Sequence, residues 1–121
     1  MISKLKYAFT HGSLSEAVHH ALLMKVSSIA LLILMPLFIF IVGPMIGRPH
    51  DEVIAFFAKP FPAVVVALTF IVGFKHFSDG VQVLLEDYVH GTARKISILV
   101  MTCLSYAAML IGLYAIIKIA I

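Results

Sequence analysis

The chain has little charge and one cysteine. Charged residues make up 12% of its 121 residues and hydrophobic residues 62%, whereas soluble proteins contain about 25% charged residues. The single cysteine, Cys103, excludes an internal disulfide, a thiol-ligated zinc site and an iron–sulfur cluster held by this chain alone. The 9 basic residues outnumber the 6 acidic ones but do not cluster on one solvated face, so no nucleic acid is expected as a partner. This composition indicates a membrane protein.

Three long stretches contain no Asp, Glu, Lys or Arg: residues 26–47, 60–74 and 96–117. About 20 apolar residues are enough to cross the ~30 Å hydrocarbon core of a bilayer. The outer two stretches are long enough, and the middle one must continue through Lys75 and Asp79. The sequence therefore predicts an all-α membrane protein with three transmembrane helices in contact with membrane lipids.

Turn and capping residues indicate where these helices end. Ser13 and Glu16 fit a capping box at the start of the first helix. Pro60 is tolerated in the first turn of the second helix. Gly91 suits the left-handed position after that helix, and Thr92 is a candidate cap for the third. We expect a single membrane domain, residues 1–121, with helices at about 14–46, 60–89 and 93–119.

Two further features predict a kink in the first helix and close packing of the third. Pro36 lies inside the first span and should kink the helix without ending it, because neighbouring helices can satisfy the freed carbonyl. Ser105, Ala108 and Gly112 place small side chains on one stripe of the third helix. Such a stripe lets another helix approach closely, so we expect a packed interface there.

The basic residues predict the orientation in the membrane. Five of them lie on the side of the N-terminus and the second turn: Lys4, Lys6, Lys25, Arg94 and Lys95. Three lie on the other side: Arg48, Lys59 and Lys118. Because basic loops stay on the cytoplasmic side, this bias favours an N-terminus inside and a C-terminus outside.

The second span carries most of the unusual polar residues: Lys75, His76, Asp79, Gln82, Glu86, Asp87 and Tyr88. Ionisable side chains at membrane depth are costly and usually have a use. At about 100° per residue, His76, Gly80 and Asp87 share one helix face, and Gly80 leaves the backbone open to a flat group. Neutral imidazole offers a lone pair to iron, so His76 is either a haem ligand or a histidine hydrogen-bonded between helices.

The other polar residues of this span have two interpretations each. Lys75 and Asp79 can neutralise each other, and we expect them to form an ion pair between helices, or they form a proton relay with Glu86. Tyr88 lies about 18 Å beyond His76 along the helix axis. It is either an interfacial tyrosine or a donor to the carbonyl of a lipophilic ligand.

At this point the residues match a known pattern. His76, Gly80 and the pair Asp87-Tyr88, within the run GVQVLLEDYVHG, closely resemble the smaller hydrophobic membrane anchor subunit of succinate dehydrogenase. Residues 19–28, HHALLMKVSS, look like the first-helix motif of that family. Three spans and the expected orientation also agree with it.

The resemblance implies roles for single residues. His76 would be an axial ligand of the iron of haem b, shared with a second anchor chain, and Tyr88 would help to hold a quinone, ubiquinone or another, with Asp87 beside it. Lys25 stands where the family usually has arginine, which would replace a bidentate grip by a single point charge. Lys25 and Ser27 are therefore only weak candidates for cofactor contacts.

The resemblance also implies the function. The chain would be a membrane anchor subunit of succinate:quinone oxidoreductase, respiratory complex II, in a bacterial cytoplasmic membrane rather than a mitochondrial inner membrane. A flavoprotein subunit and an iron–sulfur subunit would carry succinate oxidation, and a second anchor (cytochrome b) subunit would complete the haem site. The alternatives are a haem-free structural anchor and a small ion or proton transporter.

Overall fold

The computed structural model describes residues 13–121, with side chains from residue 16 onwards. Lys4, Lys6 and the side chain of Ser13, which the sequence analysis used, lie outside this part. Within it all regular secondary structure is helical, with no strand. The elements are α2 (Ser13–Val42), the 3-10 turn η1 (Gly43–Met45), α3 (His50–Phe57), α4 (Pro60–Tyr88) and α5 (Thr92–Ala120).

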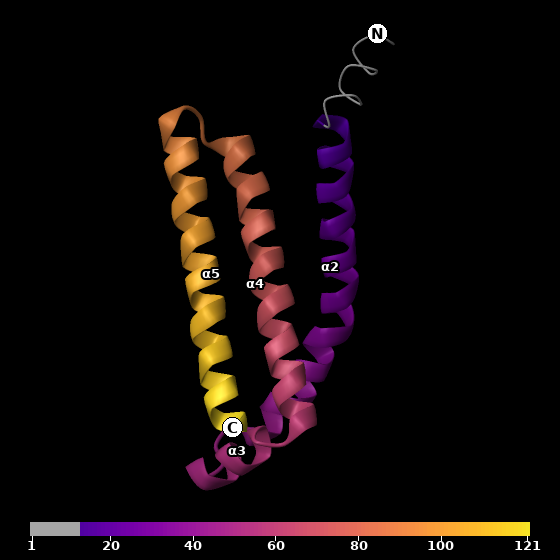
Figure 1. Ribbon diagram of the computed structural model, residues 1–121, viewed down its shortest axis with the longest axis vertical. Coiled ribbons are helices and arrows are strands. Elements are labelled where there is room, and N and C mark those ends of the chain that lie inside the picture. The colour runs from indigo at the N-terminus through magenta and orange to yellow at the C-terminus, as the bar shows by residue number, and fades with distance from the viewer. Residues whose placement is uncertain (1–12) are drawn as a thin grey trace.

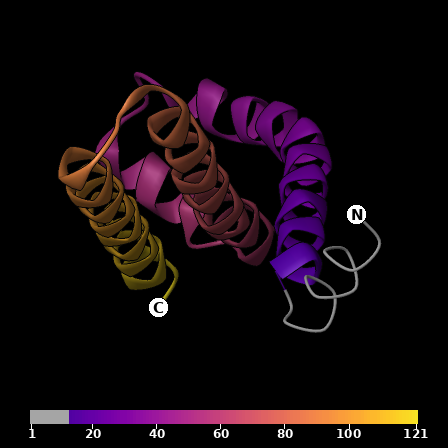
Figure 2. The same cartoon turned by 90° about the horizontal axis from the view of Figure 1, so that it is seen from above.

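The three long helices lie side by side, with α4 between α2 and α5 (Figure 1). The view from above shows the same arrangement (Figure 2). The end of α4 and the start of α5 lie at the end of the bundle where α2 begins, and α3 lies at the opposite end, beside the C-terminus. Helix α4 alone packs against both other long helices. A site on α4 can therefore include side chains from all three helices.

Three helices are long and apolar enough to cross a membrane: Glu16–Met45, Pro60–Tyr88 and Thr92–Ala120. At about 1.5 Å per residue, the 29-residue helices exceed the ~30 Å hydrocarbon core of a bilayer. Large apolar side chains such as Leu32 and Phe40 point outward and are 75% and 78% exposed. Such surface suits lipid or neighbouring chains rather than water. The predicted all-α architecture, with three helices that are candidates to span a membrane, is confirmed.

The link between the first two spans differs from the expectation. The first α-helix ends at Val42 and continues as η1, which contains Pro44, and Gly47 then turns the chain with a φ of 82°. The following residues form α3, a short helix that the sequence analysis did not predict. Its first turn carries Asp51 and Glu52, which favour a helix N-terminus, and its last residue, Phe57, is buried.

Of three local expectations, those for Gly91 and Pro36 agree with the structure and that for Thr92 does not. Gly91 has a φ of 71°, as a turn after α4 requires. Thr92 is not the cap of α5, because it is already the first helical residue and Gly91 occupies the cap position without a side-chain bond. As predicted, Pro36 does not end α2, which is continuous through it.

Two of the small residues of α5, Ser105 and Gly112, lie at packed positions. Ser105 is buried and its hydroxyl donates to the carbonyl of Met101, 2.8 Å away, so it needs no partner on another helix. A Cβ added at Gly112 would lie 2.9 Å from the ring of Phe70 on α4. Glycine therefore allows the close approach of the two helices, and the predicted packed interface is confirmed at these positions.

Replacing Gly112 tests this contact. We expect Gly112→Ala to lower the stability of the detergent-purified protein by about 1–3 kcal/mol, because overpacking forces the Phe70 ring or the helix to move. Gly73→Ala is the matched control, since its Cβ would meet only a Leu31 methyl group at 4.0 Å. Thermal unfolding compares the two, and Phe70→Leu should rescue Gly112→Ala. Equal stability of the two alanine variants would contradict the close approach.

Candidate functional site

His76 lies near the middle of α4 and is partly buried against α2. Its Nδ1 atom is 2.8 Å from the hydroxyl oxygen of Ser27, a residue 49 positions earlier in the chain. The same hydroxyl donates to the backbone carbonyl of Met24, 2.9 Å away. The structure therefore brings together two of the residues predicted as candidates, and it does so across the interface of two membrane-spanning helices.

The neighbouring Ser28 differs from Ser27 in having no hydrogen bond to His76. Ser28 also donates to the carbonyl of Met24, at 2.8 Å, but its side chain is exposed and has no partner on α4. Consecutive residues of a helix differ by about 100° in direction, so only one of the two serines can face His76. Hydroxyls in apolar helices commonly bond the carbonyl three or four residues earlier, which satisfies their proton locally.

The surroundings of His76 are open on the side of Gly80. A Cβ added at Gly80 would meet nothing within 4 Å, so no contact within the chain requires glycine there. In the described part of the chain, the bond to Ser27 is the one hydrogen bond of the His76 ring. Among the described residues, no three His, Cys, Asp or Glu side chains converge as a metal site. His76 thus offers a single nitrogen donor, one helical turn before a glycine that has space around its Cβ position.

Lys75 and Asp79 form the expected ion pair, but within one helix. Lys75 Nζ donates to Asp79 Oδ1 at 2.8 Å, and both residues belong to α4, so the predicted pairing between helices is wrong. The spacing of four residues lets the lysine bend back one turn along its own helix. Asp79 is only 8% exposed in its side chain, and with Ser27 the pair lines a cavity of about 200 Å³ between α2 and α4.

Tyr88 and Asp87 lie at the end of α4, away from His76. Both are exposed, Tyr88 to 77%. Twelve residues of continuous helix separate Tyr88 from His76, which is about 18 Å along the axis. Lys25 is also exposed, and none of the hydrogen bonds or ion pairs found in the described residues involves it. The structure therefore separates the predicted site residues into a pair inside the bundle and an exposed group.

Arg94 was not predicted as a site residue, yet it holds the turn beside Tyr88. Its Nε donates to the carbonyl of Val89 at 2.8 Å, and its Nη2 donates to the carbonyl of Glu86 at 2.7 Å. The last carbonyls of a helix lack partners within it, and a guanidinium has donors enough for two of them. A basic residue soon after a helix-ending glycine is the sequence signal for this role.

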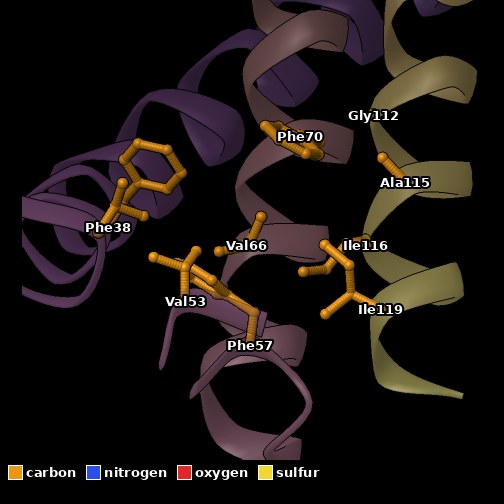
Figure 3. Close-up of a pocket in the computed structure, with 10 residues that line it drawn as sticks. Phe38, Val53, Phe57, Val66, Phe70, Gly112, Ala115, Ile116 and Ile119 are labelled. Carbon is orange, nitrogen blue, oxygen red and sulfur yellow. The ribbon is translucent and has the colours of Figure 1, made fainter. Parts of the chain in front are cut away.

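A second cavity lies near α3, at the end of the bundle opposite to Tyr88. It has a volume of about 310 Å³ and is lined by apolar residues of all four α-helices, among them Phe38, Phe57, Phe70 and Ile116 (Figure 3). Its lining includes no polar side chain. A polar headgroup needs a hydrogen-bond partner when buried, so this cavity suits an apolar chain and not a reactive group.

Comparison with known proteins identifies the family of this chain. Residues 1–112 match the family described as succinate dehydrogenase/fumarate reductase transmembrane subunit. The chain belongs to this family. It is 37% identical over 114 residues to the succinate dehydrogenase hydrophobic membrane anchor subunit of Paracoccus denitrificans, covering 94% of this chain and 88% of that one. No solved structure matches. The family indicated by the second-helix residues is thereby confirmed.

The ion pair of this transmembrane subunit can be tested by removing one partner. Lys75→Met should destabilise the protein by about 3 kcal/mol, because Asp79 stays buried without a counter-charge. The double variant Lys75→Met/Asp79→Leu should recover most of this loss. Gln82→Met is the matched control on the same helix, since it removes only an exposed 3.1 Å bond to Glu86. Denaturant titration in detergent measures the change, and equal stability of Lys75→Met and Gln82→Met would contradict the burial of Asp79.

Proposed function

We propose that this chain is the membrane anchor subunit of a succinate:quinone oxidoreductase, respiratory complex II. In this proposal His76 is an axial ligand of haem b and Tyr88 contacts the quinone. The observation that carries it is the arrangement at His76, an imidazole near the middle of a membrane-spanning helix with one nitrogen held by Ser27 and open space beside Gly80. Family membership supports the same assignment.

The residues of this chain fit a haem, but only in part. His76 offers one nitrogen donor, and Gly80 leaves room for a flat macrocycle against α4. A haem with two histidine ligands needs a second donor, which we assign to the second anchor (cytochrome b) subunit. When bound, haem b supplies a one-electron store inside the membrane. This chain would then hold the imidazole in place through Ser27.

The quinone site is assigned to the end of α4. The Tyr88 hydroxyl is exposed and can donate a hydrogen bond to a quinone carbonyl, with the carboxylate of Asp87 beside it. Arg94 holds the last carbonyls of α4 and so fixes the backbone from which Tyr88 projects. Reduction of a quinone takes up protons, and the end of the bundle gives access to water that the position of His76 lacks.

The partners follow from what this chain does not contain. It has one cysteine, so iron–sulfur clusters belong to another subunit. A flavoprotein subunit and an iron–sulfur subunit would dock at the end that carries Tyr88, where electrons reach the quinone. The five-to-three bias of basic residues supports placing this end, with the N-terminus, on the inner face of a bacterial cytoplasmic membrane and the C-terminus outside.

The two alternatives have less support. A transporter would need Lys75, Asp79 and Glu86 as a relay, yet Lys75 and Asp79 bind each other and Glu86 is exposed beside Gln82. A haem-free structural anchor leaves the orientation of His76 and the open space at Gly80 without a use.

Loss of the ligand tests the haem assignment. We expect His76→Leu to remove or strongly alter the b-type optical spectrum of the purified complex, because leucine offers no lone pair to iron. His50→Leu is the control, since His50 is an exposed histidine on α3 at the opposite end of the bundle. Reduced-minus-oxidised spectra measure the change. An unaltered spectrum in His76→Leu would reject the ligand role.

Loss of one hydroxyl tests the quinone assignment. Tyr88→Phe should lower quinone reduction by about tenfold, the equivalent of one hydrogen bond of ~1.4 kcal/mol. Succinate oxidation with a soluble dye should persist, because that step does not need this chain. Tyr114→Phe, an exposed tyrosine on α5, is the control. Parallel loss of both activities in Tyr88→Phe would argue for a general defect and against a quinone contact.

A further inference from the structure

We infer that Ser27 is a positioning residue for the haem ligand, because it holds His76 in the tautomer with the proton on Nδ1 and the lone pair on Nε2. The inference rests on the proposed function and deepens it. It assigns a role to a residue of α2 that touches neither the iron nor the quinone in this account. It also specifies which of the two ring nitrogens is the ligand.

The Ser27 hydroxyl has a single proton to donate. That oxygen lies 2.9 Å from the carbonyl oxygen of Met24 and 2.8 Å from His76 Nδ1. A carbonyl oxygen can only accept, so the bond to Met24 uses the hydroxyl proton. The bond to His76 then needs a proton from the imidazole, and Nδ1 must be the donor.

The opposite assignment is unfavourable. If the Ser27 proton pointed at Nδ1, the hydroxyl and carbonyl oxygens would face each other at 2.9 Å with no proton between them. In a bilayer there is no water to relieve that contact, because polar groups must be satisfied within the protein. Both short distances are satisfied together only when Nδ1 carries its proton.

The tautomer has a direct consequence for a metal. Neutral imidazole has one protonated nitrogen and one lone pair, so protonation of Nδ1 leaves Nε2 free to ligate. A hydrogen bond from the non-ligating N–H to a neighbouring acceptor orients the ring and raises its basicity, and loss of such partners typically weakens metal binding by about 10–100-fold. Ser27 supplies this acceptor from a different helix, so α2 sets the direction of a ligand that α4 carries.

The test compares two serines that share one carbonyl. Ser27→Ala and Ser28→Ala each remove a hydroxyl that donates to Met24, but only Ser27 contacts His76. In the purified assembled complex, Ser27→Ala should release haem to apomyoglobin about tenfold faster than the unaltered complex. Its haem midpoint potential should rise, because a less basic imidazole stabilises ferric iron less. The low-spin ferric EPR signal should shift, since the ring is free to rotate. Ser28→Ala should leave all three readouts unchanged.

A second pair of variants covers the case in which Ser27→Ala does not assemble. Ser27→Thr keeps a hydroxyl and should behave as the unaltered complex. Ser27→Val has the shape of threonine without the hydroxyl, so it should reproduce the changes expected for Ser27→Ala. The inference is overturned if haem release, midpoint potential and EPR signal stay unchanged in Ser27→Ala or Ser27→Val. It is also overturned if they change equally in Ser28→Ala or Ser27→Thr. Failure of the proposed function looks different: the unaltered complex would lack haem, or His76→Leu would keep its spectrum.

Discussion

The hydrogen bond between Ser27 and His76 is the interaction on which the proposed site depends. In a bilayer each polar group must find its partner within the protein, because the hydrocarbon offers none. The same requirement explains why the Thr69 hydroxyl donates to Val65 and why Lys75 binds Asp79. The bond at His76 differs from these two because it joins two helices, and so it ties the proposed haem ligand to the packing of α2 against α4.

The three long helices accordingly have different tasks. The central helix α4 carries the imidazole, the ion pair and the terminal tyrosine, while α2 supplies the serine that orients the imidazole. Helix α5 packs closely through Gly112 and contributes stability. Much of the apolar surface of this member of the succinate dehydrogenase/fumarate reductase family is exposed. In the proposed function, His76 supplies one haem ligand and a neighbouring chain supplies the other.

Much of the fold follows from the sequence, because charge-free runs, prolines and glycines are local signals. The three long helices and the positive φ at Gly91 are of this kind. Helix α3 was not predicted, although Asp51 and Glu52 before an apolar cluster are a signal for a helix N-terminus. The four-residue spacing of Lys75 and Asp79 indicates that they can neutralise each other, but it does not decide between a bond along one helix and bonds to another helix. The contact of Ser27 with His76 depends on how α2 is rotated against α4, and no local pattern contains that.

The most direct measurement is a cryo-EM map of the assembled complex in mild detergent, at a resolution that distinguishes the two nitrogens of an imidazole ring by its orientation. The account predicts haem density joined to Nε2 of His76, with Nδ1 still beside Ser27 and the other axial ligand from a second anchor chain. Iron held by other side chains, with His76 in contact with protein alone, would contradict it.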